Sequence, residues 1–192
     1  MKKQWCLTLI ILLFCCTSEA AIVIGNPKGS ITLTEVYDYQ CGYCRASEVS
    51  VEQLINQQDG LRVRLLPVAI INSQSVVQAA YAMSRALYHH DFNEVHHDFM
   101  FENFSDMTSI HDYIECRGMS ASIMREMQSK KVKAEILEGE TLMKSLHQHE
   151  TPLFILQSAS GTKSPVVMVG QQNAQTLSMA IESLQENTSD AR

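Results

Sequence analysis

Positively charged side chains are scarce in this sequence. Its 192 residues include 15 Lys and Arg against 21 Asp and Glu, for a formal net charge of −6. A nucleic-acid binder normally carries a surplus of cationic side chains that neutralise phosphates, and the only cationic run, Lys130, Lys131 and Lys133, is typical of a solvated helix face. No nucleic-acid partner is therefore expected.

Long hydrophobic runs are also missing. The nearly unbroken apolar run from Leu7 to Phe14 is too short to span a bilayer, which takes about 20 residues. It follows the basic Lys2 and Lys3 and precedes Ser18-Glu19-Ala20, whose small residues have the spacing that a signal peptidase recognises. Residues 1–20 are therefore predicted to be a signal peptide, and residues 21–192 to form one soluble, exported domain.

Cysteines are few, and the exported part of the chain has an odd number of them. Three of the six lie in the predicted signal peptide: Cys6, Cys15 and Cys16. Attachment of a lipid to Cys15 or Cys16 is the less favoured alternative, because Phe14 occupies a position where a small residue is wanted. The other three are Cys41, Cys44 and Cys116, whereas a scaffold held by disulfides would contain an even number. The closely spaced pair Cys41 and Cys44 therefore requires a chemical explanation.

Hydrophobic residues make up 45% of the chain, which is enough for one ordinary core. The residue patterns predict, in chain order, a strand at 31–39, a helix that ends before Asp59-Gly60, a strand at 61–66, helices alone from about 75 to 146, strands at 151–156 and 165–169, and a helix from 173. The order is β-α-β, a helical insertion at about 72–148, then β-β-α. It predicts an α/β fold with an inserted helical subdomain.

The motif Cys41-Gly42-Tyr43-Cys44 lies where the first predicted strand ends and the following helix begins. There the first sulfur is next to unpaired backbone N–H groups and to the positive end of the helix dipole, and both favour a thiolate. A free cysteine has a pKa near 8.5, so a drop of three to four units would stabilise the reduced form by roughly 4 to 5 kcal/mol. The alternative is a structural zinc-binding module, in which Cys116 or a histidine completes the ligand set.

Several segments together resemble one family. They are Gly25-Asn26-Pro27, the stretch from Glu35 to Arg45, the inserted helices, Thr151-Pro152 and the closing hairpin and helix. This combination resembles the DsbA-like periplasmic thiol:disulfide oxidoreductases of the thioredoxin superfamily. The resemblance implies a thioredoxin fold with an inserted helical subdomain and an exchange reaction that needs neither a cofactor nor a metal.

The resemblance also implies catalytic roles for three residues. Cys41 would be the exposed nucleophile, and Cys44 the less accessible thiol that resolves a mixed disulfide and forms the redox-active disulfide with Cys41. Glu35 matches the family's acidic residue beneath that disulfide. Period-two alternation places Glu35 on the same strand face as Leu33 and Tyr37, which indicates burial and a raised pKa, so that Glu35 would take and return the proton of Cys44. The alternative is an ordinary solvent-facing strand residue.

Substrate contacts are implied at two loops. Thr151-Pro152 resembles the family's cis-proline loop, which faces the cysteine motif and would present the Thr151 backbone to an extended substrate peptide. Gly42 and Tyr43, between the cysteines, would lie beside the same peptide. The alternative is an ordinary trans proline at the start of a strand.

The direction of electron flow has two candidate answers. Gly42-Tyr43 departs from the Pro-His dipeptide of the archetypal oxidase and matches the disulfide isomerase DsbC. The long N-terminal dimerisation domain typical of DsbC-like isomerases has no counterpart in the roughly ten residues between Ala21 and the first predicted strand. A monomeric oxidase is the first interpretation, with folding exported proteins as substrates and a DsbB-like quinone-linked membrane partner. An isomerase or reductase supplied by a DsbD-like reductant is the alternative.

Two other features are expected to be structural. His89, His90, His96 and His97 form two pairs in a helical pattern, and we expect them to be polar helix surface rather than metal ligands. Cys116 precedes the helix-stopping Gly118 and is expected to be a buried, small apolar residue.

Overall fold

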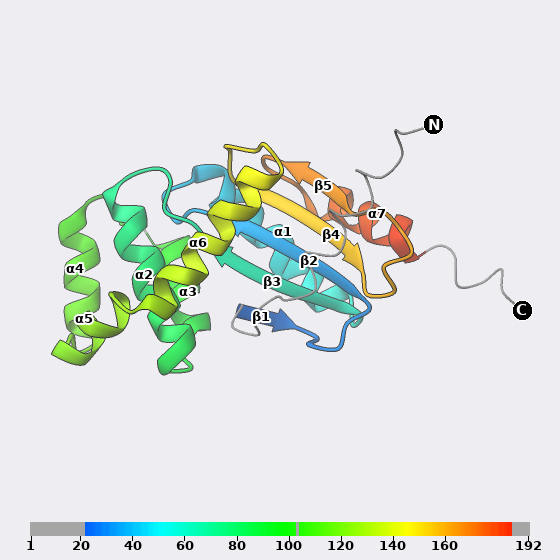
Figure 1. Ribbon diagram of the computed structural model, residues 1–192. Coiled ribbons are helices and arrows are strands. Elements are labelled where there is room, and N and C mark those ends of the chain that lie inside the picture. The colour runs from blue at the N-terminus through cyan, green and yellow to red at the C-terminus, as the bar shows by residue number, and fades with distance from the viewer. Residues whose placement is uncertain (1–21, 103, 186–192) are drawn as a thin grey trace, which may run out of the picture.

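The computed structural model in Figure 1 describes residues 22–102 and 104–185, so the predicted signal peptide lies outside the described residues. The strands are β1 (Ile22–Gly25), β2 (Ile31–Tyr37), β3 (Leu61–Pro67), β4 (Leu153–Ser158) and β5 (Val166–Val169). The helices are α1 (Gly42–Gln57), α2 (Ser73–Tyr88), α3 (Phe92–Phe101), α4 (Met107–Cys116), α5 (Ala121–Met127), α6 (Lys130–Ser145) and α7 (Ala174–Gln185).

The strands form one sheet in the order β1-β3-β2-β4-β5. The central strand β2 runs parallel to β3 and antiparallel to β4, while β1 and β5 are the antiparallel edges. The predicted α/β fold class and order of elements are confirmed, with helices α2 to α6 between β3 and β4. The prediction omitted β1, because its four residues are too few to show a period-two pattern before the turn at Asn26-Pro27.

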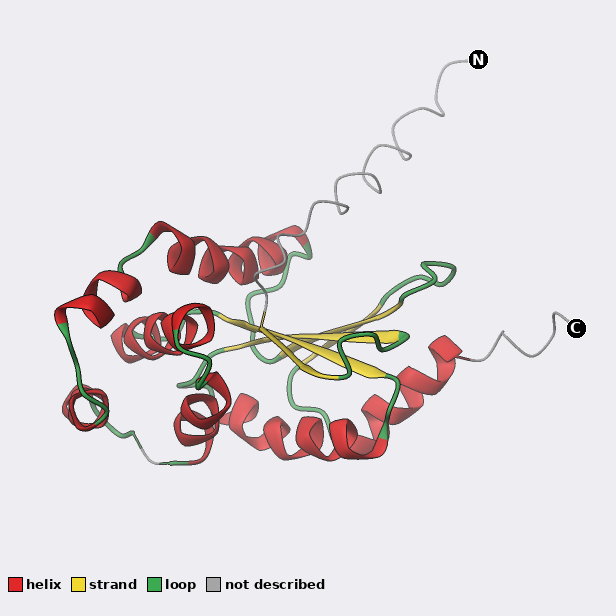
Figure 2. Cartoon of the chain, turned by 90° about the horizontal axis from the view of Figure 1, so that it is seen from below, coloured by secondary structure: helices red, strands yellow, loops and turns green. Residues whose placement is uncertain are grey.

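Helices cover both faces of the sheet. In Figure 1, α6 crosses in front of the sheet, α1 and α7 lie behind it, and α2 to α5 extend from one end; Figure 2 shows the same layers edge-on. Helix α6 lies close to the sheet at Gly139, where an added Cβ would be 2.7 Å from Val68 Cγ1. A second, smaller core cluster forms beneath α6 and includes Val36, Leu66 and Met143. These layers fix β2, which carries the cysteine motif at its carboxyl end.

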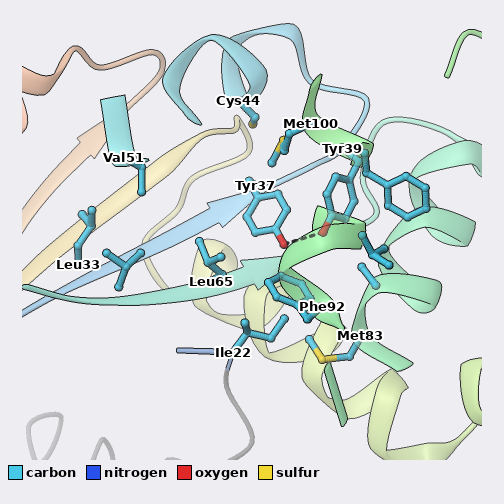
Figure 3. Close-up of a cluster of buried hydrophobic side chains, with 14 of the residues drawn as sticks. Ile22, Leu33, Tyr37, Tyr39, Cys44, Val51, Leu65, Met83, Phe92 and Met100 are labelled. Atoms are coloured by element: carbon cyan, nitrogen blue, oxygen red, sulfur yellow. Dashed lines mark hydrogen bonds between the residues drawn. The ribbon is translucent and has the colours of Figure 1, made fainter. Parts of the chain in front are cut away.

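The larger core cluster is continuous from the sheet into the helical insertion. At the end of β2, the fully buried rings of Tyr37 and Tyr39 pack edge-on with centroids 5.1 Å apart, and Tyr39 packs against Phe99 of α3 at 5.2 Å. Figure 3 shows the two tyrosine hydroxyls joined by a hydrogen bond, with Cys44 and Met100 in the same cluster. The insertion therefore packs directly against the segment that leads into the cysteine motif.

Cys116 is exposed at the last residue of α4, so the expectation of a buried position is wrong. The buried residues of this helix are Ile110 and Ile114, which lie four residues apart on one face. Two residues beyond Ile114, at about 100° per residue, the helix has turned roughly 200° and points Cys116 to the opposite side.

Candidate active site

Cys41 is the N-cap of helix α1. Its backbone is extended, with φ −82° and ψ 114°, and its Sγ accepts a hydrogen bond from the Cys44 backbone N–H at 3.4 Å. The Cys41 N–H donates in turn to the Asp38 carbonyl oxygen at 2.9 Å. The first sulfur therefore lies at the positive end of a 16-residue helix, among backbone donors that favour a thiolate. Both Cys41 and Cys44 are free thiols in this structure.

Cys41 is more accessible than Cys44, as predicted. The prediction that Cys41 is an exposed residue is wrong, because its side chain is buried. Its exposed fraction is 7%, against 0% for Cys44. Thr151 contributes to the low exposure of Cys41, because the Cys41 thiol donates a hydrogen bond to the Thr151 carbonyl oxygen at 3.2 Å. The Thr151-Pro152 peptide bond is cis, the isomer that the resemblance implied. The loop before β4 thus meets the cysteine motif across 110 residues of sequence.

The other two residues named for substrate contact lie at the surface. Gly42 is exposed, and the ring of Tyr43 is 66% exposed at the first turn of α1. Thr151 and Pro152 are buried, so their side chains are covered while Gly42 and Tyr43 face solvent. The four predicted contact residues therefore divide into a buried loop against Cys41 and an exposed helix start beside it.

The two thiols have opposite electrostatic environments. A hydrogen bond with the Cys44 side chain is the main cause that lowers the pKa of Cys41 to about 6, opposed by partial burial. Hydrogen bonds from the Thr151 side chain and from the backbone of Tyr43 and Cys44 also lower it. Burial is the main cause that raises the pKa of Cys44, and the hydrogen bond with Cys41 adds to it. One sulfur is therefore ionised at neutral pH while its neighbour retains its proton.

This asymmetry predicts a single thiolate titration. The ultraviolet absorbance of the reduced protein is expected to rise with a midpoint near pH 6, because only the Cys41 thiolate forms in that range. A Cys41→Ser variant should lose this transition, whereas Cys116→Ser should keep it. A lowest midpoint near 8.5, the pKa of a free cysteine, would contradict the assigned environment of Cys41.

Glu35 is fully buried in β2, as the alternation with Leu33 and Tyr37 predicted. Neither carboxylate oxygen has a hydrogen-bond partner, and its register partners on the adjacent strands are the apolar residues Leu65 and Phe154. Burial is the largest cause that raises the pKa of Glu35, and the charges of Glu48 and Cys41 raise it further. A carboxyl group in this position binds and releases a proton at a higher pH than an ordinary glutamate.

Sequence reasoning missed Glu48 and His96. Glu48 lies four residues after Cys44, on the same face of α1, and is 2% exposed. Its Oε1 is 3.1 Å from His96 Nε2 on α3, and His96 Nδ1 is 3.0 Å from the hydroxyl of Tyr39. His96 is 6% exposed, so the expectation of a surface residue is wrong for it, whereas His97 is indeed exposed.

The sequence contained signals for both buried groups. The helical spacing of Phe92, Val95, Phe99 and Met100 around His96 marks the buried face of α3. The i, i+4 relation of Cys44 and Glu48 marks the buried face of α1. Neither signal shows that these faces meet, because α1 and α3 are brought together only by the tertiary fold.

Asp38 is a further buried residue that sequence reasoning missed. Its Oδ1 accepts hydrogen bonds from the Gln40 N–H at 2.8 Å and the Ser75 hydroxyl at 2.5 Å. Its Oδ2 accepts from the N–H groups of Ile70 and Ile71 at 3.0 and 3.1 Å. A single carboxylate thus joins the segment before Cys41 to the start of the helical insertion.

Two further observations concern the described residues as a whole. Within residues 22–102 and 104–185, no group of three or more His, Cys, Asp or Glu side chains is arranged to hold a metal ion. Over the same ranges, the helices are all too short or too polar to cross a membrane.

Known proteins share this architecture. A family model described as thioredoxin matches residues 17–182, and no curated protein matches the chain. A thioredoxin-like oxidoreductase from Silicibacter pomeroyi DSS-3 has a similar structure, with a TM-score of 0.79, 22% identity and coverage of 89% of this chain and 95% of its own. A periplasmic thioredoxin-like protein from Salmonella enterica serovar Typhimurium has a TM-score of 0.72, 19% identity and coverage of 88% and 91%. The thiol-disulfide exchange protein alpha-DsbA2 from Wolbachia pipientis has a TM-score of 0.71, 20% identity and coverage of 86% and 88%.

Proposed function

Because the chain belongs to the thioredoxin family, whose model matches most of its length, we propose that it is an exported thiol:disulfide oxidoreductase that introduces disulfides into folding secreted proteins. The observation that carries the proposal is the pair of unlike thiols at the start of α1. The pKa of Cys41 is lowered to about 6, while that of Cys44 is raised. A stabilised Cys41 thiolate favours the reduced pair, and so makes the Cys41–Cys44 disulfide an oxidant.

The reaction has two exchange steps. A substrate thiolate attacks Cys41 Sγ of the disulfide, the Cys41–Cys44 bond breaks, and Cys44 leaves with the electron pair and takes up a proton. A second substrate thiolate then attacks the substrate sulfur of the mixed disulfide and releases Cys41 as a thiolate. The substrate loses two electrons and gains a disulfide, and the enzyme pair is reduced. In the reverse direction, Cys44 attacks Cys41 and resolves the mixed disulfide.

Glu35 is proposed to exchange the proton of Cys44. Formation of a disulfide at Cys41 removes the thiolate charge, which is one of the causes that raise the pKa of Glu35. The carboxyl group of Glu35 therefore releases its proton more readily in the states where Cys44 leaves as a thiolate, and holds it more tightly once Cys41 is ionised.

Exposed apolar side chains support an unfolded polypeptide as the substrate. Tyr43 is 66% exposed, and Ile70 and Ile71, in the loop anchored by Asp38, are 42% and 48% exposed. This loop and the cysteine motif are held by the same residue, because Asp38 also accepts from the Cys41 N–H. We propose that an extended substrate contacts Gly42, Tyr43 and the Thr151-Pro152 backbone. We further propose that residues 1–20 are removed on export, that residues 21–192 act as one soluble periplasmic domain, and that a DsbB-like quinone-linked membrane partner reoxidises the thiols.

A reductase or isomerase of the same fold is the second candidate, supported by two observations. The pKa of Cys41, about 6, is closer to that of thioredoxin, about 7, than to that of DsbA, about 3.5. The Gly42-Tyr43 dipeptide points the same way. A DsbD-like reductant would then supply the electrons.

The reduction potential of the Cys41–Cys44 pair tests the proposal. The pKa of Cys41 is about one unit below that of the thioredoxin nucleophile, and one unit raises the reduction potential by about 30 mV. Starting from the thioredoxin potential of about −270 mV, we expect about −240 mV or higher, toward the −120 mV of DsbA. Equilibration with glutathione buffers measures it, and Cys116→Ser should have the same potential. A value at or below about −270 mV would contradict the oxidase and support the reductase.

A further inference from the structure

Two buried ionisable side chains behind the thiols have no part in the exchange steps above. They are Glu48 of α1 and His96 of α3, which are 2% and 6% exposed. We propose that His96 is a positioning residue of the redox site: acting through Glu48, it sets the charge beside Glu35 and thereby governs proton exchange between Glu35 and Cys44. This inference rests on the proposed function and adds a residue from the helical insertion to it.

The first argument is a continuous chain of buried hydrogen bonds. The Tyr37 and Tyr39 hydroxyls are 3.1 Å apart, Tyr39 is 3.0 Å from His96 Nδ1, and His96 Nε2 is 3.1 Å from Glu48 Oε1. A neutral His96 satisfies every donor in one direction: Tyr37 donates to Tyr39, Tyr39 to Nδ1, and Nε2 to Glu48. A protonated His96 donates from both nitrogens, which reverses the two tyrosine bonds. A proton added to the imidazole therefore reorients both hydroxyl groups and leaves the Tyr37 hydroxyl, at the end of the chain, as the donor that needs a new acceptor.

The second argument is that His96, in contact with Glu48, is a side chain that can carry a positive charge beside two carboxylates in an apolar site. Glu48 Oε2 and both oxygens of Glu35 are buried without hydrogen-bond partners, and the charge of Glu48 raises the pKa of Glu35. The guanidinium of Arg45 on α1 donates to the Tyr39 carbonyl oxygen at 3.0 and 2.9 Å. The other titratable groups around this site are Cys41, Cys44, Tyr37 and Tyr39. All four are neutral or anionic when they titrate. From the adjacent strands, β3 and β4 present Leu65 and Phe154 opposite Glu35.

These arrangements give His96 an effect of known sign. A positive charge at His96 offsets the negative charge of Glu48, so Glu35 loses its proton at a lower pH than it would beside an uncompensated Glu48. Replacement of His96 by a neutral side chain should therefore raise the pH at which Glu35 becomes a carboxylate. Replacement of Glu48 by a neutral amide should lower it.

The test follows the step in which Cys44 attacks the mixed disulfide on Cys41, because Glu35 must then accept a proton. The reduced protein is mixed with enough oxidised glutathione to make the second step rate-limiting, and acid-quenched samples are analysed by mass spectrometry as a function of pH. We expect His96→Gln to move the midpoint of the rate profile up by about one pH unit and Glu48→Gln to move it down by a similar amount. The double variant should coincide with Glu48→Gln, because His96 acts through that carboxylate.

Two histidine variants serve as matched controls. His97→Gln changes the adjacent residue, whose side chain is 62% exposed, and His89→Gln removes another His–Glu pair in the insertion, formed with Glu126. Both should keep the wild-type midpoint. The inference is overturned if His96→Gln lowers stability but leaves the midpoint unchanged, or if the two single variants shift it in the same direction. If His96→Gln does not fold, an unchanged midpoint in Glu48→Gln overturns the inference. If the wild-type protein shows no thiol–disulfide exchange, the proposed function itself is contradicted.

Discussion

Replacement of Cys41 by serine is expected to reduce thiol–disulfide exchange to the level measured without protein. Cys41 is the thiol whose pKa is lowered, to about 6, and a thiol must be ionised to act as a nucleophile. Cys44, with its raised pKa and its fully buried side chain, cannot take its place. Oxidative refolding of a reduced, disulfide-containing protein measures the effect. Cys116→Ser, which removes the exposed cysteine of α4, should refold the substrate at the wild-type rate.

Replacement of Cys44 by serine is expected to have a different outcome. The Cys41 thiolate of this variant still attacks a substrate disulfide, but the introduced serine hydroxyl cannot displace the substrate, so the mixed disulfide accumulates. Non-reducing electrophoresis detects this mixed disulfide, and a reductant should cleave it. If Cys41→Ser and not Cys44→Ser trapped substrates, the assignment of the nucleophile would be reversed.

Replacement of Glu35 by glutamine is expected to slow the exchange of Cys44 by about 100-fold, the lower end of the usual range for a lost general acid–base. Glutamine preserves the shape of the side chain but cannot donate or accept the proton of Cys44. Single-turnover kinetics at neutral pH measures the rate. Glu52→Gln, which changes an exposed glutamate of the same helix as the thiols, is the matched control. An unchanged rate in Glu35→Gln would assign Glu35 a structural role alone.

The same substitution is expected to stabilise the protein at alkaline pH. Because the folded-state pKa of Glu35 is raised above its ordinary value of 4.5, the folded protein holds a proton that the unfolded chain has already released. The free energy of unfolding therefore falls by up to about 1.4 kcal/mol per pH unit above pH 4.5, until the folded-state pKa is reached. Glu35→Gln should remove this decline in urea unfolding experiments. A variant that lost stability in parallel with wild type would contradict the raised pKa.

Local patterns predicted the elements that position the thiols. The alternation around Glu35 predicted both strand β2 and the burial of the carboxylate, and the apolar spacing before Asp59-Gly60 predicted helix α1. Cys41 lies at the junction of these two elements and is the N-cap of α1. The sulfur environment is therefore largely a local property, which explains why the sequence was sufficient for it.

Contacts between distant segments were beyond the sequence patterns. Thr151 limits the exposure of Cys41, and His96 from the insertion reaches Glu48 of α1, although each partner lies in an ordinary local pattern. Asp38 likewise resembles a loop aspartate until its four hydrogen bonds to distant and neighbouring groups are seen. These positions are determined by how the insertion docks on the sheet, which no single stretch of residues encodes.

The exposed position of Cys116 affects how the redox state of the protein is measured. In the folded protein a maleimide reagent labels this side chain whether or not Cys41 and Cys44 are joined. After denaturation, a chain that lacks residues 1–20 gains one adduct when Cys41 and Cys44 are bonded and three when fully reduced. A product with two adducts then contains one blocked thiol, as a mixed disulfide at Cys41 would. The solvent-facing position on α4 thus supplies an internal standard for mass spectra of the cycling protein.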